Sequence, residues 1–179
     1  FVAERQGVVG VNLVALEGGF DPAAMERLAR GERFRGHALP DTLFHHAGCR
    51  ELARTQLVRS VRIAVRHDQR RQGIASALVE AVHDAFPDAV FGTLFGATPD
   101  VLRFRRAHGY HLVRIGIARG ARSGEPTAVM LRGGGLDPSS FQAAAIERLR
   151  AELARDAPVL LDRLARAPVP ASQHLLDAF

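Results

Sequence analysis

The stretch VRHDQRRQGIA, residues 65–75, decides the fold of this chain. The residues just before it alternate in the manner of a β-strand, with Val61, Ile63 and Val65 on one side. After the stretch, the apolar residues recur every four positions on one helical face, at Ile74, Leu78, Val82 and Phe86. The sequence therefore predicts a strand over residues 57–65, a polar loop and then an amphipathic helix.

This junction is suited to binding a diphosphate. The start of a helix leaves backbone N–H groups unpaired and carries the positive end of the helix dipole. Gly73 and Ala75 are small enough to let phosphates approach the backbone, and Arg70 and Arg71 add positive charge. An ordinary strand-to-helix connection with surface arginines is the alternative interpretation of the same residues.

Turn signals divide the rest of the chain into short elements. Strand patterns cover residues 1–4, 8–16, 90–95, 111–117 and 127–131. Helix signals cover residues 22–30, 98–108 and 139–155, with shorter helices expected at 49–55 and 159–166. Residues 31–50 mix Gly, Pro, His and Arg and are predicted to form a loop. This order of elements predicts an α/β protein, with a mixed sheet that carries helices.

Two motifs resemble those of the GNAT acetyltransferase superfamily. Arg70-x-x-Gly73-x-Ala75 matches the pyrophosphate motif Arg/Gln-x-x-Gly-x-Gly/Ala, and it lies between a predicted strand and a predicted helix. Residues 104–110, which end in Gly109-Tyr110, resemble the helix-to-strand corner of the same superfamily. The resemblance implies a GNAT acyl-CoA N-acyltransferase fold, whose mixed central sheet is splayed between two parallel strands, followed here by a small C-terminal helical tail.

Further segments resemble one family in particular. Residues 60–65, 102–104, 112–116, 123–124 and 127–130 are similar to the acetyltransferase module of bacterial tRNA(Met) cytidine acetyltransferases. This resemblance covers residues 1–137 well and the tail loosely. It implies acetylation of the exocyclic amine of the wobble cytidine in elongator tRNA(Met), with acetyl-CoA as cofactor, tRNA as partner and an upstream ATPase or helicase-like module absent from this chain.

The resemblance also implies a set of cofactor-binding residues. Acetyl-CoA would lie between the strands at 57–65 and 90–95, where backbone groups would stabilise the developing oxyanion. The pantetheine arm and acetyl group would be held by the backbone of Ile63, Ala64 and Val65. The diphosphate would be held by Arg70, Arg71, Gln72, Gly73, Ile74, Ala75 and Ser76. Asp100 and Arg103 are further candidates for contacts near the thiol or the arm.

No catalytic residue is assigned. Many GNAT enzymes place a Tyr as the acid for the departing thiolate four residues before the Gly of the corner, and that place is Arg105 here. A cytosine amine is neutral at pH 7, so it needs positioning more than a strong base. No third ligand accompanies His45 and His46 at metal-site spacing, and no metal is expected.

All 24 cations of the chain are arginines, and the net charge is +5. Guanidinium groups suit phosphate contacts, although a genome rich in Arg codons explains the same composition. The RNA-binding candidates are Arg105, Arg106, Arg114, Arg119 and Arg122, with a merely solvated basic face as the alternative.

We expect a GNAT domain over residues 1–132 that lacks its first strand and helices, a Gly-rich linker over 133–138 and a helical tail over 139–179. A single cysteine, Cys49, and the lack of a long apolar run fit a cytoplasmic protein without a membrane span. Two other functions stay open: a GNAT enzyme that acetylates a small amine or a protein amine, and a tRNA-binding module with an inactive GNAT fold.

Overall fold

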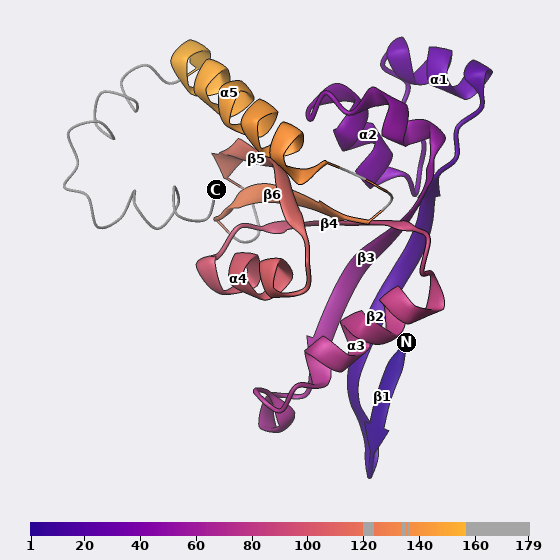
Figure 1. The fold of residues 1–179 in the computed structure, drawn as a ribbon, viewed down its shortest axis with the longest axis vertical. Coiled ribbons are helices and arrows are strands. Elements are labelled where there is room, and N and C mark those ends of the chain that lie inside the picture. The colour runs from indigo at the N-terminus through magenta and orange to yellow at the C-terminus, as the bar shows by residue number, and fades with distance from the viewer. Residues whose placement is uncertain (120–123, 134, 136, 157–179) are drawn as a thin grey trace, which may run out of the picture. The chain divides into compact units, whose positions relative to one another are not determined.

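A computed structural model describes residues 1–119, 124–133, 135 and 137–156 (Figure 1). The strands form a mixed sheet in the order β1-β2-β3-β4-β6-β5, which confirms the α/β class expected from the sequence. The chain divides into two compact units. The first comprises Phe1–Leu94 and Arg132–Gly135, and the second comprises Phe95–Leu131 and Leu136–Phe179. The division into a domain, a linker and a tail stays a prediction.

The first unit contains the strand-loop-helix junction. Its elements are β1 (Val2–Arg5), β2 (Gly7–Gly18), α1 (Pro22–Ala29), α2 (Ala38–His45), a 3₁₀ turn at Arg50–Arg54, β3 (Gln56–Val65), a second 3₁₀ turn at His67–Gln69, α3 (Ile74–Ala85) and the start of β4 (Val90–Gly96). The strand and helix predicted on either side of residues 66–73 are therefore confirmed.

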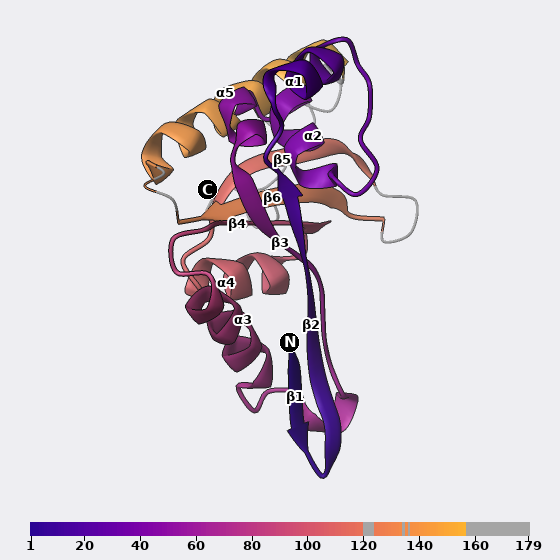
Figure 2. The ribbon, with the colours of Figure 1, turned by 90° about the vertical axis from the view of Figure 1, so that its right-hand side faces the viewer.

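Helix α3 covers one face of the antiparallel strands β1, β2 and β3 (Figure 2). Its buried residues Ile74 and Leu78 pack with Val9 of β2, and Ile63 and Val65 of β3 border this cluster. Gly10 of β2 lies directly under the helix, where an added Cβ would come within 2.8 Å of Ile74. The four-residue period seen in the sequence thus fixes α3 against the strand that precedes it.

Strands β3 and β4 run parallel and pair over a short distance only. Their register joins Leu57 to Val90, Val58 to Phe91 and Arg59 to Gly92. Within the first unit, the rest of β3 from Ser60 to Val65 pairs with β2 alone. This confirms the splayed pair of parallel strands that the resemblance implied.

The loop predicted over residues 31–50 is wrong for its middle part, which forms α2. The carboxylate of Glu17, on β2, accepts a hydrogen bond of 2.8 Å from the backbone N–H of Leu39. It thereby satisfies one of the amides at the helix start, while the N-cap residue His37 makes no side-chain cap. Because this cap comes from 22 residues upstream, the local sequence does not reveal it.

The second unit contains α4 (Pro99–Ala107), β5 (His111–Arg119), β6 (Pro126–Arg132, without its last residue) and α5 (Pro138–Asp156). Arg114 of β5 forms an ion pair with Glu152 of α5, and this contact holds the helix against the strand. The helix predicted at 159–166 lies outside the described residues. In the part of the chain that the structure describes, no helix has the length and apolar character required to cross a membrane.

Glu17 provides a test of the cap on α2. Its carboxylate is 2% exposed and also pairs with Arg59 at 2.8 Å. Replacing Glu17→Ala removes both contacts and leaves a largely buried guanidinium and a buried amide without this partner. The substitution should lower the free energy of unfolding by about 3 kcal/mol in urea denaturation. The control Glu26→Ala, at an exposed position, should cost less than about 0.5 kcal/mol, and equal losses would contradict this role of Glu17.

Candidate functional site

The loop between β3 and α3 has an unusual backbone. Arg71 has φ 64° and Gly73 has φ 77°, so two residues of this short segment are left-handed. Such a conformation is costly for Arg71, and strain of this kind is concentrated at functional sites. Alternating backbone conformations turn successive N–H groups toward one side, which is the arrangement that binds anions.

Helix α3 begins at this loop with Gly73 as its N-cap, and no side chain caps it. The first-turn amides of Ile74, Ala75 and Ser76 are therefore not taken by a cap. Ile74 itself is buried, so it offers only its backbone to a ligand. A Cβ built on Gly73 meets no protein atom within 4 Å, so there is open space beside Gly73 at the start of the helix. This geometry fits a diphosphate.

Arg5, at the end of β1, fastens the loop to the β1–β2 hairpin. Its Nη1 donates hydrogen bonds of 3.3 Å to Oε1 of Gln69 and 2.7 Å to Oε1 of Gln72. The local sequence does not reveal the contact of Arg5, because this residue lies more than 60 positions before the loop. Its only signal was the predicted hairpin, which places the end of β1 at the tip of the sheet.

The loop keeps part of its positive charge free of carboxylates. Arg66 pairs with Asp68 through two hydrogen bonds of 2.7 and 2.9 Å. The hydrogen bond from Arg66, followed by that from Gln69, lowers the pKa of Asp68 below its ordinary value. Asp68 is thus occupied by Arg66. Arg70 and Arg71 are exposed and form no ion pair among the described residues, so their charge is available to an anion.

The edge of β3 that faces away from β2 also bears on the site. The backbone amide of Arg66 donates a hydrogen bond of 2.8 Å to the carbonyl of Val9 on β2. Since backbone groups alternate sides along a strand, Ala64 also faces β2, while Ile63 and Val65 present their N–H and C=O groups to the other edge. Within the first unit β4 does not pair with this part of β3. Of the three residues proposed to hold the arm, Ile63 and Val65 have backbone groups directed away from β2.

A buried polar network lies where β3 and β4 separate. Ser60 donates a hydrogen bond of 2.9 Å to Oδ1 of Asn12, and Oγ1 of Thr93 donates a hydrogen bond of 3.2 Å to the carbonyl of Ser60. The side-chain amide of Asn12 also donates a hydrogen bond of 3.4 Å to the carbonyl of Leu78 on α3. The register of β2 and β3 shifts at this level and leaves Val61 as a bulge. The network therefore joins β2, β3, β4 and α3 next to the unpaired part of β3.

The remaining site candidates lie in the second unit. Asp100 and Arg103 are exposed on α4 and form an ion pair with each other. Their proposed contacts with the thiol or arm therefore stay a prediction.

The RNA-binding candidates separate into distinct groups. Arg105 is 4% exposed and lies over the ring of Tyr110 at 5.3 Å, and burial lowers the pKa of its guanidinium. The RNA contact of Arg105 stays a prediction, and the burial of its side chain does not favour that role. Arg114 is largely buried in its ion pair with Glu152, and its RNA contact likewise stays a prediction.

The other three RNA candidates also stay predictions. Arg106 is exposed on α4. The side chain of Arg119 and the whole of Arg122 lie outside the described residues. Among the described residues, no group of three or more His, Cys, Asp or Glu side chains could hold a metal ion, and His45 instead lies 3.9 Å from Asp41.

Comparisons with known proteins agree with this geometry. No family model matches the chain. It is 36% identical over 161 residues to a tRNA(Met) cytidine acetyltransferase of Haloarcula marismortui, covering 88% of this chain and 20% of that protein. It is 32% identical over 183 residues to a tRNA(Met) cytidine acetyltransferase of Vibrio cholerae, covering 98% of this chain and 26% of that protein. The chain thus spans about a quarter or less of the length of these relatives.

Solved structures agree on the fold. A polyamine N-acetyltransferase of Drosophila melanogaster superposes with a TM-score of 0.53 at 15% sequence identity, over 74% of this chain and 73% of that one. This likeness concerns the fold alone.

Proposed function

From the premise that this chain has the GNAT acetyltransferase fold and is related over most of its length to one segment of the tRNA(Met) cytidine acetyltransferases, we propose that it is an acetyl-CoA-dependent RNA cytidine N-acetyltransferase module. The observation that carries this proposal is the loop at Arg71 and Gly73. It opens α3 with uncapped amides, open space and two arginines free of carboxylates.

The residues of the first unit fit acetyl-CoA. The cofactor supplies an acetyl group activated as a thioester. The amides of Ile74 to Ser76, with Arg70, Arg71 and Gln72 around them, would bind its diphosphate. The backbone groups of Ile63 and Val65 that face away from β2 would orient the arm and the acetyl carbonyl. N–H groups fixed in a strand require no reorganisation when negative charge develops on that oxygen.

The acceptor we propose is the exocyclic amine of the wobble cytidine in elongator tRNA(Met). This amine is neutral at pH 7, so positioning serves it better than a dedicated base. A chain with a net charge of +5 attracts an RNA backbone and repels cationic amines. The tRNA is then the partner, an upstream ATPase or helicase-like module of the longer protein assists it, and the reaction takes place in the cytoplasm.

Gly73 tests the cofactor site. A side chain at this position projects into the space we assign to the diphosphate, so Gly73→Ala should weaken acetyl-CoA binding by about tenfold or more in calorimetric titration. Gly19→Ala is a matched control, because Gly19 has φ 69° and likewise meets no atom within 4 Å, yet lies outside the loop. Both variants should lose similar thermal stability, and equal affinity for acetyl-CoA in the two would contradict the proposed site.

The acceptor is tested with labelled acetyl-CoA and three acceptors. A tRNA(Met) transcript should gain label, the same transcript with uridine in place of the wobble cytidine should not, and spermidine should not. Preferential labelling of spermidine would favour a small-amine enzyme. If tRNA binds and acetyl-CoA does not, the chain is an RNA-binding module with an inactive GNAT fold.

A further inference from the structure

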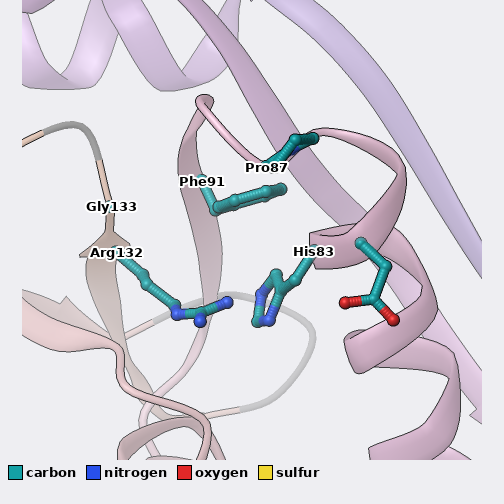
Figure 3. A pocket seen from close by; sticks show the side chains of 6 residues that line it. His83, Pro87, Phe91, Arg132 and Gly133 are labelled. Carbon is teal, nitrogen blue, oxygen red and sulfur yellow. The ribbon is translucent and has the colours of Figure 1, made fainter.

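The first unit has a hollow that the proposed cofactor site does not use (Figure 3). Its volume is about 430 Å³, and it lies among the end of α3, the start of β4 and the end of β6. The residues that line it are His83, Asp84, Pro87, Phe91, Arg132 and Gly133. The diphosphate loop precedes α3 and the hollow follows it, so about 18 Å of helix separates the two.

A cation, Arg132, lies in this hollow. Arg132 is half-buried, and its guanidinium lies 5.9 Å from the centre of the Phe91 ring. It forms no ion pair within the described ranges of the chain. The ring of His83 also packs on Phe91, at 4.5 Å. Figure 3 shows the guanidinium and the imidazole side by side below that ring. A half-buried cation with an imidazole beside it and open space in front favours an anion.

The backbone holds Arg132 in this place. Gly133 follows it with φ 86°, and a Cβ there would come within 2.6 Å of the carbonyl of Ala89. Only glycine allows this close approach of the end of β6 to the segment before β4. This close approach fixes the backbone at the end of β6, from which the side chain of Arg132 extends.

Asp84, which is exposed, also lines this hollow and bears a carboxylate. A carboxylate repels a phosphate but accepts a hydrogen bond from a hydroxyl group. A ribonucleotide unit supplies both groups, because its phosphate and its 2′-hydroxyl lie on one sugar. A DNA strand lacks the 2′-hydroxyl.

We propose that this hollow is a subsite for the RNA backbone, in which Arg132 and His83 bind a phosphate. The carboxylate of Asp84 accepts a hydrogen bond from the neighbouring 2′-hydroxyl. This inference rests on the proposed function, because it requires an RNA substrate. It adds a contact that lies on the first unit, outside the arginines that the sequence suggested for RNA.

The test measures the affinity of the full chain for tRNA(Met) over a series of salt concentrations. Arg132→Gln should weaken binding several-fold at 0.1 M salt and lower the slope of log K against log salt by about 1. Arg132→Lys should restore much of the slope, because it keeps the charge. The control Arg30→Gln, at an exposed position of the same unit, should leave both quantities unchanged.

A second variant separates the phosphate from the hydroxyl. Asp84→Asn should reduce the preference for RNA over a DNA strand of the same sequence, and it changes an exposed side chain that the fold does not need. Inorganic phosphate alone should compete only weakly. If Arg132→Gln and Asp84→Asn both bind tRNA as the control does, the subsite is overturned.

The failure of this inference differs from that of the proposed function. Acetyl-CoA binding should be the same in all of these variants, because the hollow lies at the other end of α3. A chain that binds acetyl-CoA but no tRNA would overturn the RNA subsite and leave the cofactor site standing. A chain in which Arg132→Gln loses acetyl-CoA as well as tRNA would show a structural role for Arg132 and would also overturn the subsite.

Discussion

The organisation of the first unit depends on the backbone amides at the start of α3. A helix start leaves amides without intrahelical partners, and burial without partners is costly. Here Gly73 provides no side-chain cap, and the left-handed conformations of Arg71 and Gly73 direct the chain so that open space lies in front. Arg5 secures the loop through Gln69 and Gln72. We propose that a diphosphate satisfies these amides, and the loop keeps its strained form because the surrounding contacts hold it.

The second constraint is the separation of β3 from β4. Parallel strands ordinarily continue to pair, so an early end of the ladder needs a cause. The bulge at Val61 and the network of Asn12, Ser60 and Thr93 occur together at this level. The hydroxyl of Thr93 donates a hydrogen bond to the carbonyl of Ser60. Asn12 of β2 donates a hydrogen bond to the carbonyl of Leu78 on α3. These buried contacts keep the edge of β3 that does not pair with β4 next to the loop before α3, and these are the two segments that we propose bind the cofactor.

Local sequence predicted the parts of the fold whose causes are local. The strand before Arg66 and the helix after Gly73 follow from side-chain period, and the pyrophosphate motif follows from small residues at a helix start. The missed features have distant causes. Helix α2 is capped by Glu17 from another strand, and Arg5 reaches the loop from the hairpin. The sequence around Arg105 predicts a surface arginine, whereas tertiary packing buries this side chain against Tyr110. The hollow at Arg132 joins segments more than 40 residues apart, which no local pattern records.

The central claim is that the amides opening α3 bind the diphosphate of acetyl-CoA. The most direct measurement is the shift of backbone amide resonances in ¹⁵N-labelled chain during titration with acetyl-CoA. We expect the largest changes in amide chemical shift at Arg71 to Ser76, with further changes at Ile63 and Val65 and none at Gly19. If acetyl-CoA binds but the amide resonances of Gly73 to Ser76 do not move, the diphosphate is bound elsewhere and the proposed site is contradicted.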